Sequence, residues 1–175
     1  MKFFREVKRI VKQFISLPAN IIGYFFSTFY YDAFLSKKKK ISLGNIPFCK
    51  KIVIYVIFPI NGLNDSHLNT INYFFKKKYS VLVISNRKLY QEDKKKIKTI
   101  SWALIERENY GYDFGGWRDG IIFLKEQLKS IENLILINDS TWFPINKGND
   151  FVDFIAESNL DFIGATSHYG LERFH

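Results

Sequence analysis

From residue 50 onward, short apolar runs alternate with segments whose apolar positions recur at helical spacing. Continuous runs rich in β-branched residues are typical of buried strands, and we expect strands at 52–58, 80–85, 102–106, 133–138 and 161–166. We expect helices at 66–77, with Ser66 as its cap, and at 91–98, 116–128 and 149–158. Strands that alternate with helices need crossover connections. The pattern therefore predicts an α/β fold, with a mostly parallel sheet and helices on both faces.

The first 40 residues follow a different pattern. Over 3–17 the apolar residues recur at helical spacing while basic residues take other faces, which predicts an amphipathic helix. Residues 14–31 are uncharged and aromatic-rich, but Pro18, Asn20 and Gly23 interrupt a run that is already short for a membrane span. Two readings stay open: the segment lies on anionic lipid, or it forms a helical pair that packs on its own domain or on a partner.

The change of pattern divides the chain into two expected parts. The first is a basic amphipathic and aromatic helical segment at 1–40, and the second is the α/β domain at 50–175. A boundary near 40–49 is indicated because Gly44, Asn45 and Pro47 follow a run of four lysines.

Charge and cysteine content narrow the class of protein. The formal net charge is +9, with basic residues crowded into the first fifty positions, which favours a phosphorylated ligand or an anionic membrane as partner. No nucleic-acid-binding motif is present, so nucleic acid is not expected as a partner. The single cysteine, Cys49, cannot form an internal disulfide, and the three histidines lack zinc-site spacing. We expect a cytoplasmic protein at the inner face of the cytoplasmic membrane.

Ligands of parallel sheets bind at the carboxyl ends of the strands, and two segments there carry candidate chemistry. In the first, 107–120, four glycines lie between a predicted strand and a helix, where close backbone approach and free helix N–H groups favour phosphate. Arg107 and Arg118 are placed to pair with a diphosphate, and Asp113 to accept bonds from sugar hydroxyls. The alternative is a tight strand-to-helix turn, with Arg118 and Asp119 on a solvated face.

The second segment is 134–144, where an apolar strand delivers Asn138, Asp139 and Ser140 to its carboxyl end. An aspartate at this place can coordinate a divalent metal that neutralises a diphosphate leaving group. The alternative is an Asx-turn or helix cap, a common role for these residue types after a strand.

Taken together, three segments resemble the rhamnan synthesis F family of bacterial cell-surface polysaccharide synthesis. They are Glu108-Asn-Tyr-Gly-Tyr-Asp-Phe-Gly-Gly-Trp-Arg-Asp-Gly, Leu134-Ile-Leu-Ile-Asn-Asp-Ser and Asp161-Phe-Ile-Gly-Ala-Thr. The resemblance runs from about residue 51 to the end of the sequence. It implies that 50–175 is a GT-A-like (Rossmann-like) nucleotide-sugar-binding domain. It also implies a glycosyltransferase that moves a sugar, with dTDP-rhamnose or a UDP-sugar as donor, onto a growing glycan acceptor.

The resemblance also assigns roles. Asn109 and Gly111 correspond to a donor-binding Asn-x-Gly, and the first strand end, 59–64, would hold the nucleoside base. Asn138 and Asp139 lie where related enzymes carry an Asp-x-Asp metal motif, which makes Asp139 the candidate ligand of Mg²⁺ or Mn²⁺. The candidate donor-binding residues are therefore Asn109, Gly111, Asp113, Arg118, Asn138 and Asp139.

The resemblance also indicates what is missing. Family members continue past the last of these motifs with acceptor-binding segments, and an inverting transferase needs a general base. The catalytic residues stay unassigned, and we expect a C-terminally truncated unit. A partner half encoded downstream would complete it. The alternative function is an inactive or incomplete donor-binding module that binds a membrane or a partner during polysaccharide assembly.

Overall fold

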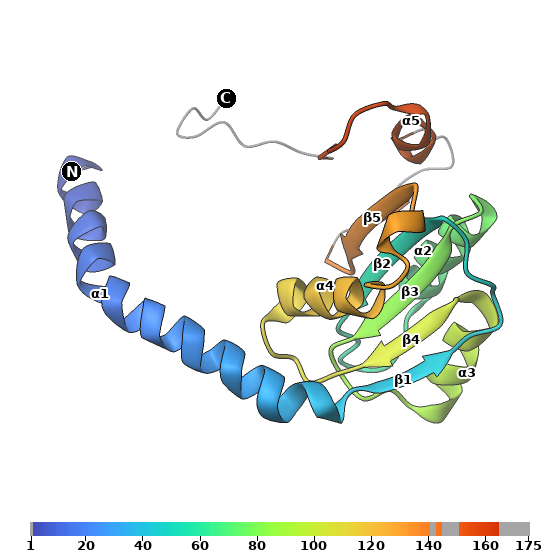
Figure 1. Ribbon diagram of the computed structural model, residues 1–175, viewed down its shortest axis with the longest axis horizontal. Helices are drawn as coiled ribbons and strands as arrows, with labels where there is room; N and C mark the ends of the chain where they lie inside the picture. Colours follow the sequence, from blue (N-terminus) through green and yellow to red (C-terminus); the bar gives the residue numbers. More distant parts are fainter. Residues whose placement is uncertain (1, 141–142, 145–150, 165–175) are drawn as a thin grey trace.

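The domain is built on one five-stranded sheet, seen in a computed structural model that describes residues 2–140, 143–144 and 151–164 (Figure 1). The strands are β1 (Lys40–Leu43), β2 (Lys51–Ile57), β3 (Ser80–Ser85), β4 (Ala103–Glu106) and β5 (Asn133–Asn138). Their order across the sheet is β1-β4-β3-β2-β5. All neighbours are parallel except β1, which pairs antiparallel with β4, so the sheet is mixed but mostly parallel, as the alternating pattern predicts.

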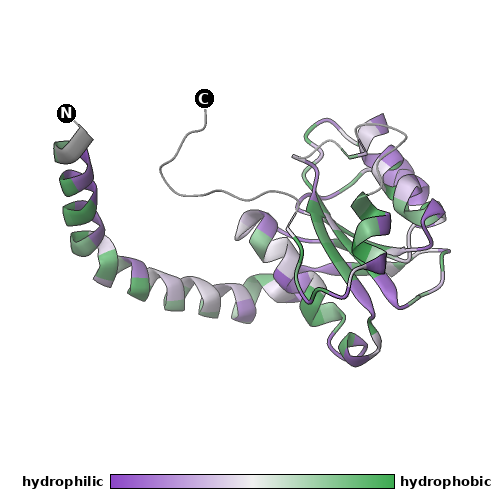
Figure 2. Cartoon of the chain, turned by 90° about the horizontal axis from the view of Figure 1, so that it is seen from above, coloured by the Kyte–Doolittle hydropathy of each residue, from purple (hydrophilic) through white to green (hydrophobic). Residues whose placement is uncertain are grey.

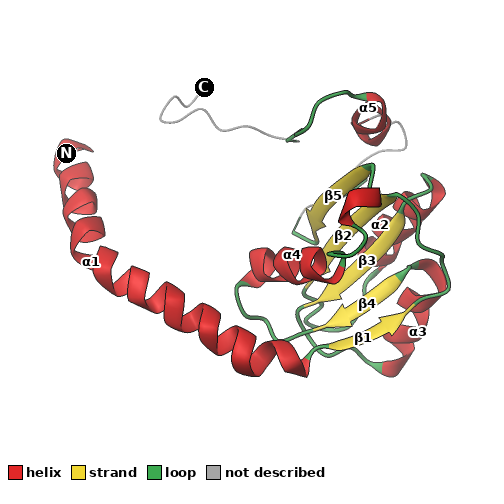
Figure 3. Cartoon of the chain, in the orientation of Figure 1, coloured by secondary structure: helices red, strands yellow, loops and turns green. Residues whose placement is uncertain are grey.

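Helices cover both faces of the sheet, as expected (Figure 3). The helices α2 (Asp65–Lys76) and α3 (Gln91–Ile100) lie on one face, and α4 (Tyr112–Phe123) lies on the other. Alternate residues of β2 divide between the two cores: Val53, Tyr55 and Ile57 pack with α2 and α3, and Ile52, Ile54 and Val56 face the α4 side. This two-sided burial explains why β2 and β3 are continuous apolar runs.

Several expected boundaries differ from the structure. Asn64, and not Ser66, caps α2, and its side chain accepts the His67 backbone N–H. The strand β1 lies in the stretch expected to be a boundary, and it holds the edge of the sheet. A short helix, α5 (Phe151–Glu157), falls within the expected 149–158. Of the strand expected at 161–166, residues 161–164 are not a strand, and 165–166 lie outside the described residues.

The N-terminal segment forms one long helix, α1 (Lys2–Tyr30), which extends away from the sheet (Figure 1). The helix continues through Pro18, so the segment is one helix and not the expected helical pair. A π-helical turn (Tyr31–Leu35) and a 3₁₀ turn (Ser36–Lys38) then lead into β1. None of the helices that the structure describes combines the length and apolar character that crossing a membrane requires.

The helix α4 begins at Tyr112, four residues before the predicted start at Gly116. Gly116 and Gly120 therefore lie inside the helix, where they let it pack closely on the sheet. A Cβ atom on Gly120 would lie 2.8 Å from both the Ile54 and Ile84 side chains, and one on Gly116 would lie 2.9 Å from Val56. These two glycines serve helix-to-sheet packing, and the prediction that they admit a ligand is wrong.

We expect Gly120→Ala to lower the free energy of unfolding by about 1–3 kcal/mol, because the added methyl group overpacks the core beside Ile54. The control is Gly23→Ala in α1, where a Cβ atom would meet nothing within 4 Å. That change should be neutral or raise helix stability by up to about 1 kcal/mol. Urea unfolding of both variants gives the comparison, and equal stabilities would contradict the packing role.

Candidate functional site

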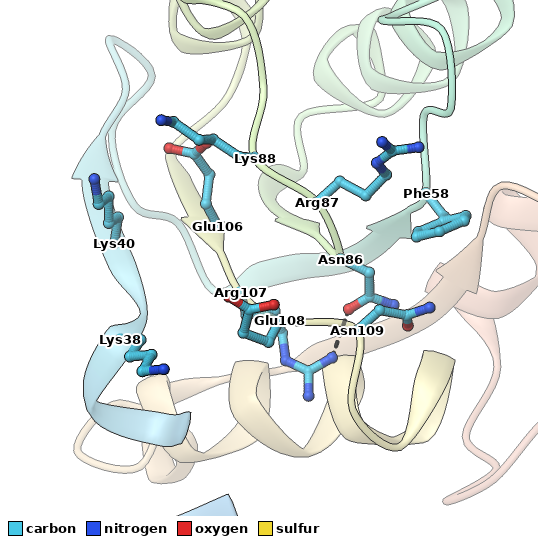
Figure 4. A pocket seen from close by; sticks show the side chains of 10 residues that line it. All are labelled: Lys38, Lys40, Phe58, Asn86, Arg87, Lys88, Glu106, Arg107, Glu108 and Asn109. Carbon is cyan, nitrogen blue, oxygen red and sulfur yellow. Dashed lines mark hydrogen bonds between the residues drawn. The ribbon is translucent and has the colours of Figure 1, made fainter. Parts of the chain in front are cut away.

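A pocket of about 420 Å³ opens at the carboxyl edge of the sheet, where ligands of parallel sheets are expected (Figure 4). Three strand ends contribute to it: Phe58 follows β2, Asn86 to Lys88 follow β3, and Arg107 to Asn109 follow β4. Glu106, at the end of β4, completes this wall. Lys38 and Lys40 come from the other direction, from the segment that joins α1 to the sheet. The pocket is thus shared by the α/β domain and the N-terminal segment.

Cationic side chains dominate the pocket. Five of the lining residues are basic and two are acidic: Lys38, Lys40, Arg87, Lys88 and Arg107 against Glu106 and Glu108. Glu106 has a structural role, because its carboxylate accepts the Leu89 backbone N–H at 2.8 Å and pairs with Lys94 at 2.8 Å. The guanidinium of Arg87 lies over the Phe58 ring, 5.5 Å from its centroid. Such a surface favours an anionic ligand, and phosphate above all.

Arg107 is buried beneath the pocket, and all three of its guanidinium nitrogens donate hydrogen bonds to protein atoms. Its Nε donates to the Asp119 carboxylate at 2.8 Å, and both side chains are fully buried. One terminal nitrogen donates to Asn86 Oδ1 at 2.5 Å, and the other donates to the Tyr110 carbonyl at 2.5 Å. Arg107 therefore shapes the floor of the pocket, and the prediction that it pairs with a diphosphate is not favoured.

Tyr31 completes this buried cluster from the N-terminal segment. Its hydroxyl donates to Asp119, its ring stacks on Tyr110 with centroids 5.5 Å apart, and Lys39 Nζ lies 3.0 Å from the same aspartate. Burial and the hydrogen bond to Asp119 raise the pKa of Tyr31 from 10.0 to about 12, against the opposing effect of Arg107. The phenol thus stays protonated and remains a donor throughout the physiological pH range.

Arg118 and Asp119 are adjacent in the sequence but differ in exposure and in partners. Arg118 pairs with Asp32, at 2.9 and 3.0 Å to the two carboxylate oxygens, and lies outside the lining of the pocket. The alternative that places both residues on a solvated face fails for Asp119, whose side chain is fully buried. Arg118, through Asp32, and Asp119, through Tyr31 and Lys39, both hold the N-terminal segment against α4.

The remaining candidate residues lie in two neighbouring groups. Asn109 lines the pocket. Gly111, with φ of 72°, caps α4 in a left-handed conformation that favours glycine and turns the chain from β4 into the helix. At the end of β5, on the far edge of the sheet from β4, Asn138 Nδ2 donates to the Asp113 carboxylate at 2.6 Å, which ties this strand end to the first turn of α4.

Asp139 is held next to the pocket by two donors. Its Oδ2 accepts the Phe58 backbone N–H at 2.6 Å and contacts His67 Nε2 at 3.2 Å. The Asn64 backbone N–H donates to His67 Nδ1 at 3.2 Å, so the proton of this ring is on Nε2 and is donated to Asp139. Burial opposes ionisation, but the hydrogen bonds from His67 and Phe58 prevail and lower the pKa of Asp139.

These residues do not form a metal-binding set. Among the described residues, no group of three or more histidine, cysteine, aspartate or glutamate side chains is placed to hold an ion. The Oδ2 atom of Asp139 already faces two N–H donors, which is unlike a metal-ligand oxygen. In the part of the chain that the structure describes, these side chains therefore do not form a preassembled site for the Mg²⁺ or Mn²⁺ that the resemblance implies.

Sequence reasoning missed three contributors to the site. Asn86 and Arg87 follow a predicted buried strand, which places them at the edge where ligands are expected, but sequence reasoning assigned no role to them or to Lys88. His67 could have been found as the third helical residue of a capping box. Nothing in the local pattern singles out Tyr31, because its role depends on residues 76 and 88 positions away.

Comparison with known proteins identifies a matching family. The family model described as rhamnan synthesis protein F matches residues 81–175, which contain β4, β5, all but the first residue of β3 and most of the pocket. No solved structure matches the chain.

One relative extends the match to the N-terminal part. The uncharacterised protein y4gN of Sinorhizobium fredii is 35% identical over 163 residues, which are 93% of this chain and 42% of the relative. The chain thus spans less than half the length of the relative that it matches.

We expect Tyr31→Phe to lower the free energy of unfolding at neutral pH by about 1–3 kcal/mol, because Asp119 loses a buried donor. Tyr30→Phe is the matched control, since Tyr30 is exposed and should change stability by less than about 0.5 kcal/mol.

The pH dependence of that loss tests its cause. The pKa of Tyr31 is 10.0 in an unfolded chain and about 12 in the folded one, so its stabilisation is complete below pH 10.0 and is lost as pH rises toward 12. The gap between wild type and Tyr31→Phe should therefore narrow over this interval in urea unfolding. A gap that stays constant would contradict the buried phenol.

Proposed function

The chain belongs to the rhamnan synthesis protein F family, and from this premise we propose that it binds a nucleotide-sugar donor for glycosyl transfer in bacterial cell-surface polysaccharide synthesis. The observation that carries the proposal is the cationic pocket at the carboxyl edge of a mostly parallel sheet. The fold we propose is GT-A-like, and its donor is dTDP-rhamnose or a UDP-sugar. Because the family match includes the strands and loops on one side of this pocket, both observations point to the same edge.

We assign the diphosphate to the basic side chains that line the pocket and, unlike Arg107, are not part of the buried cluster, among them Arg87, Lys88 and Lys38. A planar guanidinium can bind two phosphate oxygens at once, which makes Arg87 the main diphosphate ligand in this proposal. The Phe58 ring, partly exposed beneath Arg87, offers a stacking surface for the nucleoside base. Asn109 also lines the pocket, where its amide can bond donor hydroxyls or phosphate.

The second group of residues is assigned to the sugar side. Asp113 and Asn138 form one hydrogen-bonded unit, and Asp139 is fixed beside Phe58 at the pocket wall. In this proposal they orient the donor, and Arg118 has no donor-binding role because its charge is paired with Asp32. The cations of the pocket supply the countercharge that a divalent metal gives in other transferases.

A second candidate is a donor-binding module without turnover of its own, which acts with a partner half. The engaged carboxylates favour it: Asp113, Asp139 and Glu106 each accept hydrogen bonds from neighbouring residues, which does not suit a general base. Donor turnover by the purified chain would exclude this candidate. Binding without turnover, followed by turnover when the product of a neighbouring reading frame is added, would support it.

Calorimetric titration with dTDP and UDP tests donor binding. We expect one of them to bind, and Arg87→Ala to weaken its affinity about tenfold, which corresponds to roughly 1.4 kcal/mol for one charge-assisted contact. Lys125→Ala is the control, because it removes the same charge from an exposed position that does not line the pocket. Equal losses in both variants would indicate a general charge effect, and no binding by folded wild type would refute the proposal.

The metal requirement has its own test. Because the protein's cations supply the countercharge in this proposal, nucleotide affinity in excess EDTA should stay within about threefold of the affinity with Mg²⁺ or Mn²⁺. The same titration repeated with each metal and with EDTA decides this. Binding that disappears in EDTA would assign the countercharge to the ion.

A further inference from the structure

The helix α1 exposes a continuous apolar face along its length. Phe4, Val11, Ile15, Ile22 and Phe29 are separated by seven, four, seven and seven positions, which places them on one side of an α-helix, and all are exposed. The helix has 29 residues and is therefore about 43 Å long, at 1.5 Å of rise per residue. Figure 2 shows hydrophobic and hydrophilic positions alternating along it as the helix turns. An exposed apolar face of this extent is typical of an interaction surface.

The α/β domain does not cover this face. Between residues 4 and 50, Tyr31 alone is buried, and among the described residues no element of the sheet domain makes an extensive contact with α1. The expected alternative of a helical pair packed on its own domain is therefore wrong. The helix is attached at its C-terminal end, where Tyr31, Asp32 and Lys39 bond to Asp119 and Arg118.

The opposite side of the helix is basic. Arg5, Arg9 and Lys12 lie on the polar face, where Glu6 is the one acidic residue of the helix. Nine of the first forty residues are Lys or Arg and two are Asp or Glu. Basic side chains beside an apolar, aromatic-rich face complement the combination of acyl chains and negative headgroups that an anionic lipid surface offers.

We propose that α1 lies in the interface of an anionic membrane, with the Ile15 and Ile22 side buried among the acyl chains. This occupant is favoured over a protein partner because the basic side chains of residues 5–12 lie beside the apolar face and complement phosphate headgroups. The anchor at Tyr31 then fixes the α/β domain relative to the bilayer. The position of the pocket relative to the bilayer is fixed as well, because Lys38 and Lys40 of the same segment line that pocket. The proposal does not depend on the identity of the ligand.

Vesicle flotation of the full chain tests the proposal. Recovery should be high with vesicles of phosphatidylglycerol and phosphatidylcholine, lower with phosphatidylcholine alone, and reduced by salt. The double variant Ile15→Glu/Ile22→Glu changes two side chains that are 76% and 70% exposed, so the fold is retained while the apolar face is broken. We expect its partitioning to fall at least about tenfold.

The matched control is Gln13→Glu/Asn20→Glu. It adds the same two charges, also seven residues apart, to exposed positions of the polar face. We expect this control to lose partitioning only in part, through reduced attraction to the headgroups.

Other outcomes would overturn the proposal. Equal losses in the two double variants would mean that charge alone, and not the apolar face, mediates binding. Equal binding to neutral and anionic vesicles would exclude the anionic surface. No flotation, with a lipid-free dimer in sedimentation that Ile15→Glu/Ile22→Glu dissociates, would assign the face to a second copy of the chain. None of these results depends on nucleotide binding, so failure here leaves the proposed function untouched.

Discussion

The buried ion pair between Arg107 and Asp119 is the interaction on which the rest of the structure depends. It joins the end of β4 to the middle of α4, and both charges are removed from water. Such a pair is stable only when its remaining donors and acceptors are satisfied. These partners are Asn86, Tyr110, Tyr31 and Lys39, the last two from the N-terminal segment. Loss of Asp119 would leave the Arg107 guanidinium buried without a counter-charge, whereas loss of Arg107 would leave Asp119 with Lys39 and Arg118.

This arrangement divides the cations of the site into two kinds. Arg107 has its donors directed at protein atoms, so it contributes rigidity below the pocket. Arg87 and Lys88 face the pocket from an exposed loop, so they can respond to a ligand. The rigid base fixes the backbone from which these exposed cations extend, whereas ordering their long side chains on a ligand would cost entropy.

The sequence pattern predicts the centre of the sheet well, and the physical reason is burial on both faces. The strand from Lys51 to Ile57 and the strand from Ser80 to Ser85 are apolar at nearly every position, which no exposed element would be. The antiparallel strand from Lys40 to Leu43 was not predicted, because an edge strand that is half exposed has no such run. Its pairing with β4 is a tertiary effect that local propensity does not encode.

The site was predicted less completely than the fold. Strand ends pointed to the edge where the pocket opens and to Asn109, since topology decides where parallel strands end. The glycines were misassigned, because a glycine that admits a neighbouring isoleucine looks the same in a sequence as one that admits a ligand. Arg107 and Arg118 look alike in sequence as well, and only the distant residues Asp119, Tyr31 and Asp32 distinguish their roles.

The position of Tyr31 has a practical consequence for anyone who isolates the α/β domain. Composition places the border between segment and domain at residues 40–49, which suggests that expression of the isolated domain should start there. A chain that starts there would lack the Tyr31 hydroxyl, which donates to Asp119, and the Lys39 ammonium, which pairs with it, and it would lack Lys38 from the wall of the pocket. The smallest unit that retains the chemistry of the site therefore begins before Tyr31, inside what the composition marks as a separate appendage.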